Sequence, residues 1–100
     1  MHTHTVFFWL KDDTDRERRA AFRDGLDKLT REPHIRDCRI GEPAGTRRDV
    51  VDSTYDYAIV LKFDDLGGHD AYQVSPEHEV FLDHCLPMIE RVQVYDVAHT

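Results

Sequence analysis

Residues 55–63, YDYAIVLKF, alternate large apolar side chains with small or polar ones, and this period of two decides the fold. Such alternation is typical of a β-strand, because successive side chains point to opposite faces of the sheet. The large residues share one face, and they are Tyr55, Tyr57, Ile59, Leu61 and Phe63. The opposite face carries Ala58 and Val60, whose small side chains suit packing under helices. We therefore expect the aromatic-rich face to look away from the helices.

Residues 4–10, HTVFFWL, form a second strand, and both of its faces are apolar. Val6, Phe8 and Leu10 share one face, while Phe7 and Trp9 share the other. A sheet that faces water on one side would not carry two such faces. Something must therefore bury the second face, and we expect Phe7 and Trp9 to pack in the core beneath the helices.

The first helix of the chain follows this strand. Thr14 and Glu17 have the spacing of a capping box, in which each side chain satisfies a main-chain N–H group at the start of a helix. The apolar residues Phe22, Leu26 and Leu29 then recur on one helical face. The pattern predicts a helix of about four turns that ends near Pro33.

The rest of the chain alternates short elements with turn signals. Residues 35–40 resemble a short edge strand, and residues 42–53 form a polar loop with a proline and a glycine. Asp64 and Asp65 are suited to cap a short helix, and Ser75 and Pro76 are suited to begin another. We expect that last helix to stop before Pro87 and a final strand to cover residues 92–97.

The order strand, helix, strand, strand, helix pair, strand predicts one domain over residues 1–100. It is the ferredoxin-like α+β arrangement, a four-stranded antiparallel sheet with helices on one face. The face without helices would be bare in a monomer, and a large bare apolar patch indicates an interface. We therefore expect a homodimer, formed through the open sheet face, in which two sheets build an α/β barrel.

Residues 71–81, AYQVSPEHEVF, carry the strongest chemical signal in the chain. His78 falls in the first turn of the helix that begins at Pro76, and its spacing to Phe81 places the imidazole on the apolar face. Tyr72 precedes the helix break. If the turn between the two helices is tight, the phenol and the imidazole converge on one cavity.

Composition excludes several classes of function. The net charge of −7 and the mixing of basic with acidic residues around Arg16–Arg19 argue against a nucleic-acid partner. No apolar run has the length of a membrane span, and the chain shows no signal peptide, so we expect a cytoplasmic protein. Cys38 and Cys85 form no CxxC pair, and we expect reduced, partly buried thiols.

The chain resembles the stress-responsive dimeric α/β-barrel (Dabb) family. The resemblance rests on His4 before an apolar strand, on the alternating strand from Tyr57 to Phe63, on Tyr72-x-x-x-Pro-x-His78-x-x-Phe81, and on the closing Val94-Tyr95-Asp96. It implies the ferredoxin-like fold and the dimer. The family includes stress proteins, proteins of unknown role and a plant polyketide cyclase, so the resemblance leaves the function open.

The resemblance also assigns candidate residues. In the cyclase a histidine acts as base and a tyrosine supports the substrate, and by the motif these catalytic roles fall on His78 and Tyr72. The ligand pocket implied by the cyclase includes His4 and Phe81. Two further pocket positions, occupied in the cyclase by a histidine and a tyrosine, correspond here to Tyr57 and Leu26.

Three functions agree with the sequence. The first is a dimeric barrel without catalysis, in which His78 only closes the end of the core. The second is a binder of a small apolar or aromatic ligand, and the third is a cofactor-free cyclase, lyase or monooxygenase with His78 as general base. His2 and His4 could join His78 as three nitrogen ligands, but no carboxylate or thiolate partner is evident, so we expect neither a metal nor a cofactor.

Overall fold

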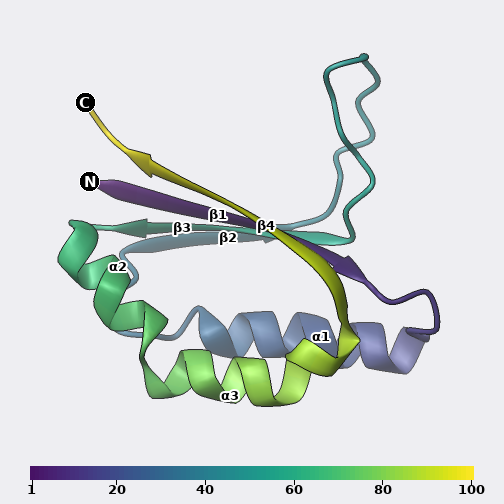
Figure 1. The fold of residues 1–100 in the computed structure, drawn as a ribbon, viewed down its shortest axis with the longest axis horizontal. Coiled ribbons are helices and arrows are strands. Elements are labelled where there is room, and N and C mark those ends of the chain that lie inside the picture. The colour runs from purple at the N-terminus through teal and green to yellow at the C-terminus, as the bar shows by residue number, and fades with distance from the viewer.

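The four strands form one antiparallel sheet in the order β2-β3-β1-β4, and the helices cover one of its faces (Figure 1). This is the architecture of the computed structural model, which describes residues 1–100. It confirms the ferredoxin-like arrangement expected from the element order. The elements are β1 (His2–Leu10), α1 (Arg16–Leu29), β2 (Asp37–Gly41), β3 (Tyr57–Phe63), α2 (Leu66–Gln73), α3 (Pro76–Cys85), a 3₁₀ turn (Leu86–Met88) and β4 (Ile89–Ala98).

Strand β1 lies in the middle of the sheet, between β3 and β4. Its pairing begins at His2, which is opposite Phe63 on one side and Ala98 on the other. His2 and His4 therefore lie within the paired sheet. The two outer strands, β2 and β4, each have one unpaired edge.

The helices pack on the aromatic-rich face of β3, so the predicted orientation of this strand was wrong. Tyr57, Ile59, Leu61 and Phe63 are all buried in the core, whereas Ala58 and Val60 are only half-buried on the open face. The reason is area. Covering the larger apolar side chains removes more surface from water, at about 25 cal/mol per Å², and the bulky residues fill the space above the sheet.

Phe7 and Trp9 also lie on the open face, and not in the helix-packed core as predicted. Both rings contact Tyr55, with ring centroids 4.9 Å and 6.4 Å away, and Phe7 also contacts Tyr95. Tyr55 reaches this face because regular pairing in β3 begins only at Tyr57. Tyr55 is therefore on the open face as expected, whereas Tyr57 is stacked on Phe22 beneath the helices.

Each α-helix begins at a residue whose side chain accepts a main-chain N–H bond. Asp65 caps α2 and Ser75 caps α3, as predicted. For α1 the cap is Asp15, one residue later than the predicted Thr14, because the Asp15 carboxylate accepts from the N–H of Arg18 at 2.8 Å. None of these helices combines the length and the hydropathy that a membrane crossing requires.

The segment between β2 and β3 has no helix or strand and rises from the sheet on the side opposite the helices (Figure 1). Its base is tied to β1. The Trp9 indole donates to the Thr54 hydroxyl at 2.9 Å, and the main-chain N–H of Leu10 donates to the Asp56 carboxylate at 2.7 Å. The loop therefore stands beside the open face.

Gly25 of α1 packs closely against Cys85 and Phe81 of α3. A Cβ atom there would lie 2.6 Å from the Cys85 sulfur, which is buried. We expect Gly25→Ala to lower the free energy of unfolding by about 1 kcal/mol, since overpacking costs about 1–3 kcal/mol and the gain in helix propensity is only about 0.5–1.

Urea denaturation followed by circular dichroism measures this change. The control is the same substitution in a Cys85→Ala background, where the clashing sulfur is gone. Gly25→Ala should be neutral or stabilising there, and an equal loss in both backgrounds would contradict the packing explanation.

Candidate functional site

An apolar groove of about 140 Å³ lies between the sheet, the end of α2 and the helix α3. Eleven of its fourteen lining residues are hydrophobic. They are Val6, Phe8, Leu29, Ile59, Tyr72, Phe81, Leu82, Leu86, Ile89, Val92 and Val94, and the other three are His4, Gln73 and His78. A groove with mostly apolar walls and a few polar groups is the usual form of a small-molecule site. Its volume is close to that of a cavity that accommodates benzene, about 150 Å³.

The break between α2 and α3 brings Tyr72 and His78 together. The main-chain carbonyl of Tyr72 accepts hydrogen bonds from the hydroxyl and from the N–H of Ser75, at 2.8 Å and 3.1 Å. Ser75 Oγ in turn accepts from the N–H of His78 at 3.2 Å. The turn is therefore tight, and the Tyr72 and His78 rings meet edge to face with centroids 5.2 Å apart.

The surroundings determine the protonation of both side chains. Burial, reinforced by the nearby charge of Glu32, raises the pKa of the Tyr72 phenol far above its usual range. Burial, with a smaller contribution from His4, lowers the pKa of His78. At neutral pH Tyr72 therefore keeps its proton and can donate it in a hydrogen bond, whereas His78 is uncharged and can accept a proton.

The other sequence-predicted pocket residues are divided by the structure. His4 and Phe81 line the groove with Tyr72 and His78. Leu26 and Tyr57 do not line it. Leu26 is fully buried in the core, and the Tyr57 ring lies under the Arg19 guanidinium and against Phe22. The two positions that differ from the cyclase thus lie outside the groove.

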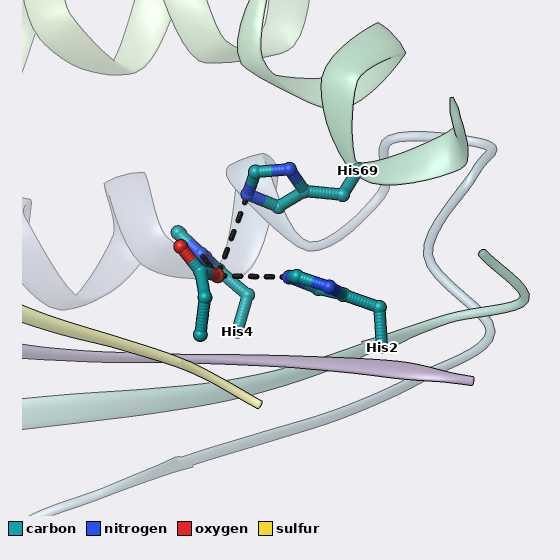
Figure 2. A group of neighbouring side chains, drawn as sticks. His2, His4 and His69 are labelled. Atoms are coloured by element: carbon teal, nitrogen blue, oxygen red, sulfur yellow. Dashed lines mark hydrogen bonds and ion pairs between the residues drawn. The ribbon is translucent and has the colours of Figure 1, made fainter. Parts of the chain in front are cut away.

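A polar cluster that the sequence did not reveal lies at the His4 end of the groove. His2 Nε2 and His4 Nδ1 lie 2.9 Å and 2.6 Å from one carboxylate oxygen of Asp96, and His69 Nε2 lies 3.5 Å from the same oxygen. Figure 2 shows the three imidazoles pointing toward this oxygen. The cross-strand pairing of His4 with Asp96 creates the contact. Only the register of β1 on β4 could have revealed it.

The ionisation of this cluster follows from burial and hydrogen bonding. Burial lowers the pKa of His4, and the hydrogen bond to Asp96 opposes this effect without reversing it. Burial acts to raise the pKa of Asp96, but the hydrogen bonds from His4 and His2 outweigh it and lower the pKa. At neutral pH an Asp96 carboxylate therefore accepts from neutral His4.

The two cysteines are free thiols, as expected. Cys85 is buried between α1 and α3, and burial raises its pKa to about 11. It is therefore protonated at neutral pH and is no nucleophile.

Comparison with protein families agrees with this architecture. The family model described as "Stress responsive A/B Barrel Domain" matches residues 3–99. The chain belongs to the Dabb family. A search of curated protein sequences finds no match.

Several solved structures share the Dabb fold. A dimeric ferredoxin-like protein of unknown function from Thermobifida fusca is 24% identical, with a TM-score of 0.81 and coverage of 98% of this chain and 90% of its own. A Dabb family protein from Mesorhizobium loti is 21% identical, with a TM-score of 0.79 and coverage of 99% and 96%. A hydroxynitrile lyase from Passiflora edulis is 16% identical, with a TM-score of 0.83 and coverage of 99% and 93%. At these identities the likeness establishes the fold alone.

The low pKa of His78 is testable by NMR. We expect its ring signals to titrate with a midpoint below about 6.5, the usual value for histidine. The pKa of His78 is lower in the folded state than in the unfolded state, so neutral His78 contributes to the free energy of unfolding. This contribution is fully present above about pH 6.5 and is lost as the pH falls through the folded-state pKa.

The histidine ring protons are followed from about pH 4 to pH 9. The signals of His78 are those that are missing from the spectrum of His78→Gln, which has no imidazole at this position. Urea denaturation of the two proteins should show a steeper loss of stability below about pH 6.5 in the wild type. A midpoint at or above about 6.5 would contradict the burial of His78.

Proposed function

We propose that this Dabb domain is a homodimer that binds a small apolar compound, of about one aromatic ring, in the groove beside Tyr72 and His78. The observation that carries the proposal is the pairing of a hydrogen-bond donor, Tyr72, and a proton acceptor, His78, at one wall of a mostly apolar groove. Tyr72 suits a carbonyl oxygen of the ligand, since its phenol stays protonated. The ligand therefore belongs to the aromatic carbonyl compounds or their hydroxylated forms.

The size and exposure of the groove support this ligand class. A volume of about 140 Å³ holds one ring and few further atoms. The wall formed by β4 carries Val92 and Val94, whose exposed fractions are 43% and 39%. A ligand lying on this wall would remove their apolar surface from water.

The open sheet face supports the homodimer. It carries Phe7, Trp9, Tyr55 and Tyr95, which surround a hollow of about 250 Å³, and Tyr95 is 57% exposed. Arg91 lies over the Trp9 ring at 4.2 Å. Aromatic and arginine side chains are enriched at protein interfaces. Related structures from Thermobifida fusca and Jannaschia are described as dimeric, and we infer the same for this chain.

A charge in the middle of the open face should break the dimer. Val60 is half-buried on β3 and its side chain points to this face. We expect the wild type to elute as a dimer and Val60→Asp as a folded monomer, because an interface would have to bury an unpaired carboxylate.

Size-exclusion chromatography with light scattering measures the mass. The matched control is Val74→Asp, the same change at a valine that is 80% exposed at the end of α2. A monomeric wild type, or a dimer that survives Val60→Asp, would exclude this interface.

Ligand binding is testable with benzaldehyde as the probe. In two-dimensional NMR spectra we expect the probe to shift the signals of His78 and of its neighbours in the groove. Tyr72→Phe should weaken binding about fivefold, which corresponds to one hydrogen bond of about 1 kcal/mol.

The matched control is Tyr95→Phe, which removes a hydroxyl from the open face and should leave the affinity unchanged. Benzene serves as a second probe, because it fits the groove and has no oxygen for Tyr72. Equal weakening by Tyr72→Phe and Tyr95→Phe, or no shifts near His78, would exclude binding at this groove.

A second candidate function is a cofactor-free lyase or cyclase that acts on an aromatic or polyketide-like substrate. The specific observation in its favour is that His78 is uncharged at neutral pH and lies beside a phenol that can hold a substrate oxygen. The hydroxynitrile lyase from Passiflora edulis has the same fold, which is consistent with this second candidate.

Cleavage of mandelonitrile tests this second function. His78 would take the hydroxyl proton, and the bond to the nitrile carbon would break with its electron pair leaving on cyanide, which gives benzaldehyde. The protonated His78 would then pass the same proton to cyanide, which forms hydrogen cyanide and restores the neutral base. Benzaldehyde release is followed by ultraviolet absorbance. Loss of about 100-fold or more in His78→Ala would support catalysis, whereas an unchanged rate would show that the groove only binds.

We place the protein in the cytoplasm. Cys38 and Cys85 are free thiols, and unpaired cysteines are typical of proteins kept under reducing conditions.

A further inference from the structure

The cluster at the N-terminal end of β1 contains four side chains that can each offer one metal-ligand atom. They are His2, His4, His69 and Asp96, and their ligand atoms all lie within 4.8 Å of one another. His2 and His4 come from one face of β1, Asp96 from the paired position on β4, and His69 from α2 above the sheet. We propose that this cluster binds one divalent transition-metal ion, with zinc as the best fit.

The donor set selects the kind of ion. Three imidazole nitrogens and one carboxylate oxygen suit zinc, cobalt, nickel, copper or iron, whereas magnesium and calcium prefer oxygen ligands. A tetrahedral zinc site needs ligand atoms about 3.3 Å apart, given zinc bonds of about 2.0–2.2 Å. The Asp96 oxygen already lies 2.9, 2.6 and 3.5 Å from the three nitrogens. All the ligand atoms lie within 4.8 Å of one another, so the most distant pair would have to close by about 1.5 Å at most.

The orientation of His69 is a second, independent observation. Its Nδ1 lies 3.1 Å from the Asp70 carboxylate, while its Nε2 faces Asp96. When Nδ1 donates to Asp70, Nε2 is the nitrogen left to bind an ion. A carboxylate that holds the far nitrogen of a histidine is the usual support of a metal ligand. The amide nitrogen of Gln73 also lies 3.3 Å from the same Nε2.

Burial and access also fit an ion. The three histidines are 4–8% exposed, so the protein has already removed them from water in a converging arrangement. The Asp96 side chain is 41% exposed, which provides a path of entry. An ion of charge +2 would compensate the carboxylate more strongly than hydrogen bonds from imidazoles can.

The site differs from the one that the sequence suggested. His78 is not part of it, since the third nitrogen comes from His69. The carboxylate that seemed to be missing is Asp96, which the register of β4 brings to His4. Because His4 also lines the groove, a bound ion would lie at one end of it.

Calorimetric titration of the metal-free, untagged protein with zinc sulfate tests the proposal. We expect one zinc per chain with a dissociation constant of about 1 µM or tighter. Asp96→Asn and His69→Ala should weaken binding about 100-fold or more, and Asp70→Asn about 10- to 100-fold. The Asp70 side chain is 68% exposed, so the Asp70→Asn protein should fold even if a core variant does not.

The matched control is His84→Ala, which removes an exposed histidine of α3 and should leave zinc binding unchanged. Cobalt provides a second readout, since its visible spectrum reports ligation by nitrogen and should disappear in Asp96→Asn. Absence of a stoichiometric site, or equal losses in His84→Ala and Asp96→Asn, would overturn the proposal. The readout is metal binding alone, so it is independent of the ligand proposed for the groove.

Discussion

Strand β1 is paired on both edges and lies beneath the helices on one face, and most of the molecule follows from this arrangement. Its buried face changes in character along the strand. Val6, Phe8 and Leu10 form part of the apolar core, whereas His2 and His4, on the same face, form a polar end. Because the strand is a continuous part of the sheet, the core and the candidate site share one rigid support. A displacement of β1 by one residue would turn all five side chains to the other face.

The second constraint is the break between α2 and α3. A single continuous helix would place Tyr72 and His78 six residues apart, on different faces. The Ser75 hydroxyl donates to the carbonyl of Tyr72 and also accepts from the N–H of His78, so one side chain ends α2 and starts α3. Pro76 fits here because the first helical residue needs no N–H partner. The geometry of the site thus results from helix capping and requires no strained backbone.

The sequence was sufficient for the element order, the fold and the two caps at Asp65 and Ser75, because these depend on local patterns. It was insufficient for the orientation of β3. Alternation defines two faces of the strand, one with Ala58 and Val60 and one with larger residues. Which face is buried depends on the space that α1 and α3 leave above the sheet, and the larger residues fill it. The Tyr72 and His78 pair was predictable from one short segment, whereas the contact of Asp96 with His4 depends on residues 92 positions apart.

The polar end of the core stabilises the fold less than apolar residues would, and this difference indicates what the polar end does. Apolar residues at positions 2 and 4 would contribute about 1.5–3 kcal/mol each when buried, whereas buried imidazoles must be compensated by hydrogen bonds. Asp96 provides that compensation for two of them, and Asp70 and Gln73 do so for His69. A chain under selection for stability alone has a simpler solution, since leucine and valine already fill the other end of the same face. The convergence of four costly polar groups beside the groove is therefore more consistent with a binding role than with packing.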